Sequence, residues 1–146
     1  MKTFVSILML TFLLFAGCKK EDEEVHFTIF AKGSFPTSEK LHFLESNLVI
    51  QNQSNWVGFS EKLERATIEV NNFRAMDVDF EIHTLLVILS GERSQATEII
   101  VNEIVDSGKL ITVSFSEQEQ ADQTNNQSFC IVKIDKRTSR YAFDRK

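Results

Sequence analysis

The distribution of phenylalanine constrains the fold of this chain most. Of its 13 Phe residues, three lie within the first 17 residues, and the others alternate with polar residues in several places. Successive side chains of a strand point to opposite faces, so this alternation is typical of strands that bury one face. The chain has only five glycines and one proline. The pattern predicts a Phe-rich core built mainly from β-strands.

The N-terminus has the parts of an export signal. Lys2 supplies a positive charge, residues 4–15 are almost all apolar, and Phe15-Ala16-Gly17-Cys18 resembles the lipobox of bacterial lipoproteins. The apolar run is shorter than the roughly 20 residues that span a bilayer. We therefore predict a lipoprotein signal peptide over residues 1–17 and lipidation of Cys18, with acyl chains such as palmitate holding the protein on a membrane.

A charged run, Lys19-Lys20-Glu21-Asp22-Glu23-Glu24, follows the cysteine. Such a run does not pack, so residues 18–24 are predicted to be a solvated tether. A basic-then-acidic stretch beside the lipid also resembles the signal that sends some Gram-negative lipoproteins to the outer face of the cell. We expect a position in the cell envelope, on the outer membrane and exposed at the surface.

The remaining composition predicts one acidic domain over residues 25–146. Without residues 1–17 the 146-residue chain keeps 129 residues, with 15 basic against 21 acidic side chains. This balance lacks the clustered basic face that nucleic acid requires, so no nucleic-acid partner is expected. If Cys18 carries lipid, Cys130 has no cysteine to pair with, and the fold has no disulfide.

Several segments have the pattern of strands. The run at residues 83–89 is apolar throughout, which is typical of a central strand covered on both faces. Asp106-Ser107-Gly108 has the turn chemistry of a hairpin. The other predicted strands are residues 25–35, 41–43, 48–50, 97–105, 109–115, 128–135 and a short edge strand at 140–144.

One amphipathic helix is predicted after residue 50. Trp56, Phe59, Leu63 and Ala66 fall on one helical stripe, and Ser54 is a suitable N-cap. Together these patterns predict the α+β class, a mostly antiparallel β-sheet with one packed amphipathic helix.

Two polar segments are predicted to be loops on this sheet, where binding groups usually lie. The first follows the central strand and consists of Gly91, Glu92, Arg93, Ser94, Gln95 and Ala96. The second is the polar run Glu117–Gln127, which has no periodicity and is predicted to be flexible. We take the first as the candidate partner-binding loop, joined by the second.

The sequence offers no strong catalytic pattern. His26, His42 and His83 lie far apart, and no zinc-ligand spacing appears among them. Cys130 lies within a predicted strand, which favours a buried side chain over a thiol nucleophile. Asp77, Asp79 and Glu81 alternate, so they could share one strand face and hold a cation such as calcium, but a solvated edge strand is the favoured interpretation. We expect no cofactor, no metal and no enzymatic activity.

The order of motifs from about residue 47 to 137 resembles the C-terminal domain of the PrcB family, named for a lipoprotein-associated subunit of a bacterial surface protease complex. This resemblance implies a non-catalytic subunit or binding module and carries over no catalytic residue. The matching stretches are Leu48-Val49-Ile50 with Trp56 and Leu63, Val78-Asp79-Phe80, Leu85–Leu89 running into Gly91-Glu92-Arg93, Gly108–Val113, and Ile131–Lys136.

The chain departs from the family after Gly-Glu-Arg. Family members have a Pro-x-Gly-Gly-Tyr loop there, whereas this chain has Ser94-Gln95-Ala96-Thr97, without the glycines that permit positive φ and without the aromatic ring. We expect a lipid-anchored accessory domain that binds or stabilises another exported protein, such as a protease. Two alternatives stay open: a protease inhibitor that uses the same loop as a wedge, and an enzyme of undefined chemistry.

Overall fold

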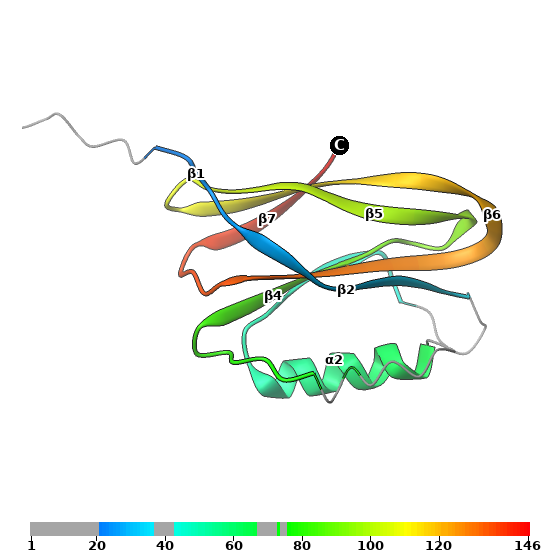
Figure 1. Ribbon diagram of the computed structural model, residues 1–146, viewed down its shortest axis with the longest axis horizontal. Helices are drawn as coiled ribbons and strands as arrows, with labels where there is room; N and C mark the ends of the chain where they lie inside the picture. The colour runs from blue at the N-terminus through cyan, green and yellow to red at the C-terminus, as the bar shows by residue number, and fades with distance from the viewer. Residues whose placement is uncertain (1–20, 37–42, 67–72, 74–75) are drawn as a thin grey trace, which may run out of the picture.

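The computed structural model describes residues 21–36, 43–66, 73 and 76–146. In this part of the chain seven strands form one sheet, and one helix packs against it (Figure 1). The predicted α+β class, with a mostly antiparallel sheet and one packed amphipathic helix, is confirmed. The elements are β1 (Glu23–Glu24), β2 (Phe27–Pro36), β3 (Ser46–Ile50), α2 (Gln53–Ala66), β4 (His83–Leu89), β5 (Arg93–Asp106), β6 (Leu110–Asp135) and β7 (Arg140–Arg145).

The long strand β6 belongs to both halves of the sheet. Its first half pairs with β5 and, in parallel, with β7, whereas its second half pairs with β2, β4 and the start of β5. Between the halves, residues 120–123 of β6 lie opposite the single residue Ala96 of β5, and this bulge bends the strand. The sheet therefore folds into two layers, and α2 packs below the layer that contains β2 and β4 (Figure 1).

Two apolar cores result from this arrangement. Alternate residues of β4 and of the second half of β6 enter different cores, because successive strand side chains point to opposite faces. The core between the two sheet layers contains Val25, Leu86, Ile88, Ile99, Val101, Ile104, Ile111, Val113, Phe115, Cys130, Val132 and Ile134. The core between the sheet and α2 contains Phe35, Ile50, Trp56, Phe59, Leu63, Phe73, Val78, Phe80, Leu85, Val87, Leu89, Phe129 and Ile131.

Several predicted strands are confirmed. β4 is buried from Thr84 to Leu89, as expected of a central strand. The β5–β6 hairpin turns at Gly108, which has a φ of 86° and donates its N–H to Asp106 Oδ1 at 2.7 Å. β7 pairs only with β6 in the described part of the chain, as an edge strand would.

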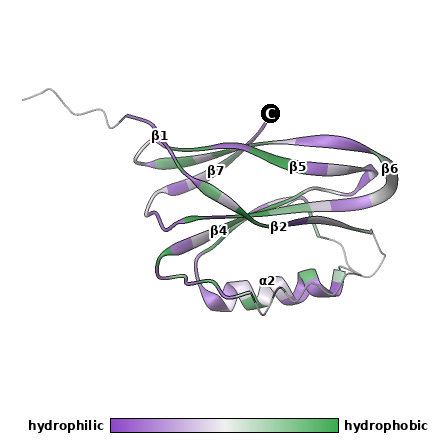
Figure 2. Cartoon of the chain, viewed as in Figure 1, coloured by the Kyte–Doolittle hydropathy of each residue, from purple (hydrophilic) through white to green (hydrophobic). Residues whose placement is uncertain are grey.

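The prediction of a flexible loop at Glu117–Gln127 is wrong. The whole segment lies within β6, where its first residues pair with β5 and its last residues pair with β2 and β5. Hydrophilic residues flank the bend of β6 (Figure 2). They fit a strand because the side chains of Gln118 and Glu119 are exposed while their backbone pairs with β5.

The helix is confirmed, but its predicted cap is not. Trp56, Phe59 and Leu63 are buried, and α2 begins at Gln53. The N-cap is Asn52, whose Oδ1 accepts the Asn55 N–H at 2.9 Å, and not Ser54. An N-cap side chain bonds an amide two or three residues later, and this bond places the helix start just after Asn52.

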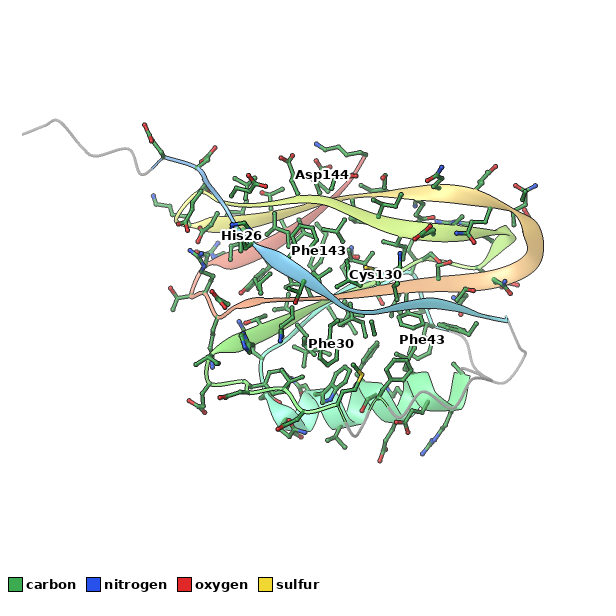
Figure 3. All side chains as sticks on the ribbon, in the orientation of Figure 1. His26, Phe30, Phe43, Cys130, Phe143 and Asp144 are labelled. Carbon is green, nitrogen blue, oxygen red and sulfur yellow. The ribbon has the colours of Figure 1, made fainter. Side chains whose placement is uncertain are left out.

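The first predicted strand is confirmed as β2, with a bulge between Ile29 and Ala31. The bulge breaks the simple alternation, so Ile29 is exposed and Phe30 turns towards the helix. The Phe30 ring meets Trp56 edge to face, with the ring centroids 5.6 Å apart. Figure 3 shows Phe30 and Phe43 between the sheet and α2, with Cys130 between the sheet layers.

The start of the described chain differs from the predicted tether. Glu23–Glu24, expected to be solvated, form β1 and pair with Asp106 and Val105 of β5, although their side chains remain exposed. The signal peptide and Cys18 lie outside the described residues, as do most of the predicted strand at 41–43 and His42. In the described part, no helix has the length and apolarity needed to cross a membrane.

Candidate functional site

The predicted partner-binding loop is mostly a strand. Only Ser90 to Glu92 connect β4 to β5, and Arg93, Ser94, Gln95 and Ala96 already belong to β5. The loop prediction failed because β5 is extended by pairing with Asn126 and Thr124, residues far away in sequence. Glu92, Ser94 and Gln95 have exposed side chains; the side chain of Ala96 lies outside the described part.

Arg93 is held in a cluster of four charged residues. Its guanidinium lies 3.3 Å from a carboxylate oxygen of Glu45 and 3.3 Å from Glu117 Oε2. Arg145, near the end of β7, lies 3.1 Å from the same two carboxylates. This charge cluster (Glu45, Arg93, Glu117 and Arg145) joins β5, β6, β7 and the segment before β3.

Glu117 is the buried member of the charge cluster. It follows Ile111, Val113 and Phe115 at two-residue spacing on β6, so it points between the sheet layers, and its side chain is only 6% exposed. A buried carboxylate needs charged partners, and the two guanidiniums supply them. Gly91 leaves room for the cluster, since a Cβ there would lie 3.0 Å from Glu45 Oε2. Arg93 therefore holds the fold together and is not free to contact a partner.

Gln127, at the end of the second predicted loop, has a structural role that the sequence analysis missed. Its side chain is buried, and its amide both accepts from the Phe43 N–H at 3.2 Å and donates to the Phe43 carbonyl at 2.5 Å. The two bonds fix the backbone of Phe43 on the sheet, just before β3. The sequence did contain a signal for this burial: Gln127 lies at two-residue spacing from Phe129 and Ile131, which lie on the same face of β6.

Cys130 and the carboxylates of Asp77, Asp79 and Glu81 were considered above for catalysis and metal binding. Burial raises the pKa of the Cys130 thiol to about 11, so the thiol stays protonated at neutral pH. Asp77, Asp79 and Glu81 lie in the exposed turn before β4 and not on an edge strand, because Asp79 Oδ1 accepts the Glu81 N–H at 2.9 Å and supports a turn. The described residues contain no group of three or more His, Cys, Asp or Glu able to hold a metal ion.

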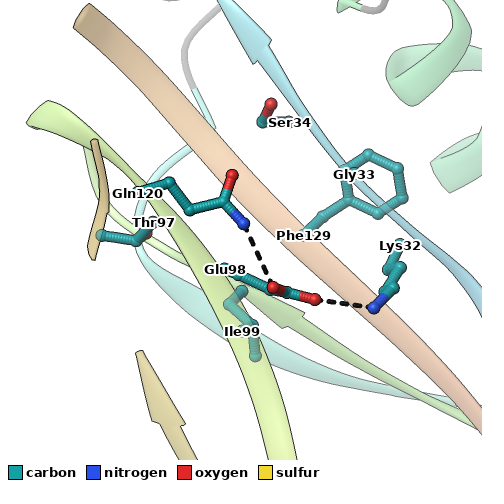
Figure 4. Close-up of a pocket in the computed structure, with 8 residues that line it drawn as sticks. All are labelled: Lys32, Gly33, Ser34, Thr97, Glu98, Ile99, Gln120 and Phe129. Atoms are coloured by element: carbon teal, nitrogen blue, oxygen red, sulfur yellow. Dashed lines mark hydrogen bonds and ion pairs between the residues drawn. The ribbon is translucent and has the colours of Figure 1, made fainter. Parts of the chain in front are cut away.

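A small cavity of about 170 Å³ opens between β2 and β5, where the two sheet layers are not joined by backbone pairing (Figure 4). Lys32 Nζ and Glu98 Oε1 lie 2.6 Å apart across it, and Gln120 Nε2 donates to Glu98 Oε2 at 3.1 Å. The hydrogen bond and charge of Glu98 raise the pKa of Lys32, which therefore stays charged. This exposed bridge satisfies its own charges and leaves no unpaired reactive group.

A larger groove of about 950 Å³ lies between β3 and α2. We call it the β3–α2 groove. Its residues come from the segment before β3, from β3 itself and from one face of the helix. They are Phe43, Leu44, Ser46, Asn47, Leu48, Val49, Ile50, Ser54, Asn55, Gly58, Phe59, Lys62, Arg65 and Leu89.

The floor of the β3–α2 groove is apolar and incompletely covered. Leu48 points to the helix side of the sheet, opposite the fully buried Val87, yet it is 37% exposed. Leu44, just before β3, is 83% exposed. On the helix, a Cβ added at Gly58 would meet nothing within 4 Å. A missing side chain on α2 therefore widens a groove that exposes leucine on the sheet.

Comparison of the chain with protein-family models, curated proteins and solved structures finds no significant match.

Proposed function

We propose that this protein is a lipid-anchored, non-catalytic binding domain that holds another exported protein in the cell envelope. The observation that carries the proposal is the β3–α2 groove, an apolar hollow beside a strand that has only one sheet neighbour in the described part of the chain. Apolar grooves lined by a few polar groups are typical of binding sites. The proposed contact surface thus moves from Gly91–Ala96 to this groove.

Anchoring at Cys18 gives the binding domain its location. Two or three acyl chains bind a bilayer stably, because each buried methylene contributes about 0.8 kcal/mol. The folded part then needs no membrane-facing surface of its own and can present its groove to a partner. The outer membrane, with the domain exposed at the surface, remains the proposed position.

The resemblance to the PrcB family suggests an exported protease complex as the partner. An accessory subunit of this kind stabilises the enzyme without contributing catalytic groups. The inhibitor alternative receives less support, because its wedge was the segment Gly91–Ala96, which is largely a strand with Arg93 committed to the charge cluster. Cys130 does not support the enzyme alternative as a nucleophile, because its thiol is fully buried.

Crosslinking in intact cells tests the proposed function. The full-length protein and its Cys18→Ser variant are compared after treatment with a short amine-reactive crosslinker and detergent extraction. We expect the parent protein in the membrane fraction with one exported protein crosslinked in near-stoichiometric amount, and the variant in the aqueous fraction. Recovery of the parent without any protein partner, or firm membrane attachment of the variant, would contradict the proposal.

A further inference from the structure

We infer that the β3–α2 groove binds an extended peptide segment, apolar in the middle and acidic at one end, which adds as a new strand to the edge of β3 that has no partner among the described residues. This inference rests on the proposed function and specifies the chemistry of the partner. It is carried by three independent features: a strand edge without a partner among the described residues, an apolar groove beside it and basic side chains at one end of the groove.

The first feature is the edge of β3. Within the described residues β3 pairs only with β4, so its other edge presents backbone N–H and C=O groups without sheet partners. Other outer strands carry charged residues or proline that hinder further pairing, such as Lys32 and Pro36 in β2 and Arg140 in β7. β3, with the sequence Ser-Asn-Leu-Val-Ile, has neither charge nor proline. It is therefore the edge best suited to strand addition.

The second feature is the shape of the groove. A strand added to β3 would lie about 4.8 Å away, and alternate side chains would point towards α2. On that side the groove exposes Leu48, and Gly58 leaves open space on the helix. β3 has five residues, which corresponds to a segment of about 17 Å. The groove thus suits a short strand with apolar side chains at alternate positions.

The third feature is charge. Among the described residues that line the groove, Lys62 and Arg65 alone are charged, and both are exposed. They lie three residues apart, on one face of the helix. Neither side chain has an ion-pair partner in the described part of the chain, whereas Arg93, Arg137 and Arg145 are all paired with carboxylates. On a protein with net charge −5 this local positive charge favours acidic residues in the partner.

The position of Lys62 and Arg65 determines where the acidic end of the bound segment lies. α2 follows β3 after the short connection Gln51–Asn52, so the helix runs back along the strand. Phe59 meets Phe43, which precedes β3, with ring centroids 6.1 Å apart. Lys62 and Arg65 therefore lie beside the beginning of β3, and the acidic end of the bound segment belongs there.

Peptide binding to the full-length protein in nonionic detergent tests the inference. The probes are two fluorescent peptides with the same core, Val-Thr-Ile-Thr-Val, flanked at both ends by two Glu or by two Lys. The variants are Gly58→Phe, which fills the groove from the helix, and the double variant Lys62→Glu/Arg65→Glu. The matched control is Lys109→Glu/Arg140→Glu, which changes net charge equally on exposed residues outside the groove.

We expect the acidic peptide to bind at least about tenfold tighter than the basic one, with a difference that shrinks as salt rises. Both groove variants should weaken acidic-peptide binding about tenfold or more, and the control should stay within about twofold of the parent. Trp56 fluorescence reports whether each variant is folded. Should Gly58→Phe fail to fold, the Lys62→Glu/Arg65→Glu variant decides the result. Absent binding, equal binding of both peptides, or groove variants that bind normally would overturn the inference.

The crosslinking experiment separates this inference from the proposed function. If the groove variants still capture the same exported partner as the parent protein, strand addition at β3 is wrong and the binding function stands. If the parent captures no partner, the proposed function itself fails.

Discussion

At the scale of single residues, the space around a position decides the role of the residue there. Gly58 and Gly33 illustrate this, because both lie inside regular elements. A Cβ at Gly58 would meet nothing within 4 Å, whereas a Cβ at Gly33 would lie 3.2 Å from the ring of Phe129. The sequence marks both simply as glycines, and only the fold shows that one lies over a ring and the other over an open groove.

We expect Gly58→Ala to raise the free energy of unfolding by about 0.5–1 kcal/mol, because alanine restricts the unfolded chain and favours helix. Urea unfolding followed by the fluorescence of Trp56, the single Trp, measures the change. Gly33→Ala is the matched control and should give no such gain, since its Cβ crowds Phe129. Equal stabilisation by both substitutions would contradict the account of Gly58.

Cys130 should make stability depend on alkaline pH. Burial raises the pKa of its thiol from the ordinary 9.0 to about 11, so the folded state holds the proton more tightly than the unfolded state. The associated stabilisation is complete below about pH 9 and is lost as pH rises towards 11. Relative to Cys130→Ala, the parent should therefore lose about 1–3 kcal/mol of unfolding free energy between pH 8.5 and 11. Parallel pH profiles would contradict the assigned burial effect.

At the scale of elements, we expect the charge cluster to stabilise the part of the sheet where β5, β6 and β7 meet. Glu117 is nearly buried between two guanidiniums, whereas Glu119, two residues further along β6, is exposed. The two residues share a strand and a charge but not an environment. Removing the charge at each position isolates the contribution of the cluster.

Glu117→Gln should lower the free energy of unfolding by about 1–3 kcal/mol, because Arg93 and Arg145 lose their shared buried partner. Glu119→Gln should leave stability unchanged within about 0.5 kcal/mol, as expected of an exposed substitution. Urea titrations at low salt measure both. A Glu117→Gln variant as stable as the parent would show that the cluster is not needed for stability.

The elements also show how far the sequence predicts this fold. β4, the β5–β6 hairpin and α2 follow from local signals: an apolar run, a turn at Gly108 and a helical stripe with Trp56. The bend of β6 could not be predicted from the sequence. Residues 117–127 owe their strand conformation to pairing with β2 and β5, which are distant in sequence. The β3–α2 groove was missed for a similar reason, since it depends on how far α2 covers Leu48, and no local pattern records this.

At the scale of the whole molecule, β1 fixes how the domain is attached to the proposed anchor. Glu23–Glu24 pair with Asp106 and Val105, so the path from Cys18 to the fold is at most about five residues, or about 17 Å when extended. The β5–β6 hairpin lies at this end of the molecule, and the bend of β6 lies at the other (Figure 1). The proposed lipid on Cys18 would therefore hold the hairpin near the bilayer and point the bend away from it.

Fluorescence quenching in liposomes tests this orientation. A fluorophore is attached to Lys109→Cys, in the hairpin, or to Gln118→Cys, near the bend; both parent side chains are exposed, and the buried Cys130 should not react. The two positions are nine residues apart in sequence, which corresponds to about 30 Å along the strand. Lipids with nitroxide headgroups should quench the label at position 109 more than twofold better than the label at 118. The same measurement on detergent-solubilised protein without nitroxide lipid gives the unquenched reference. Equal quenching at the two positions would show that β1 does not set the orientation, because a long, freely moving tether would place both ends at the membrane equally often.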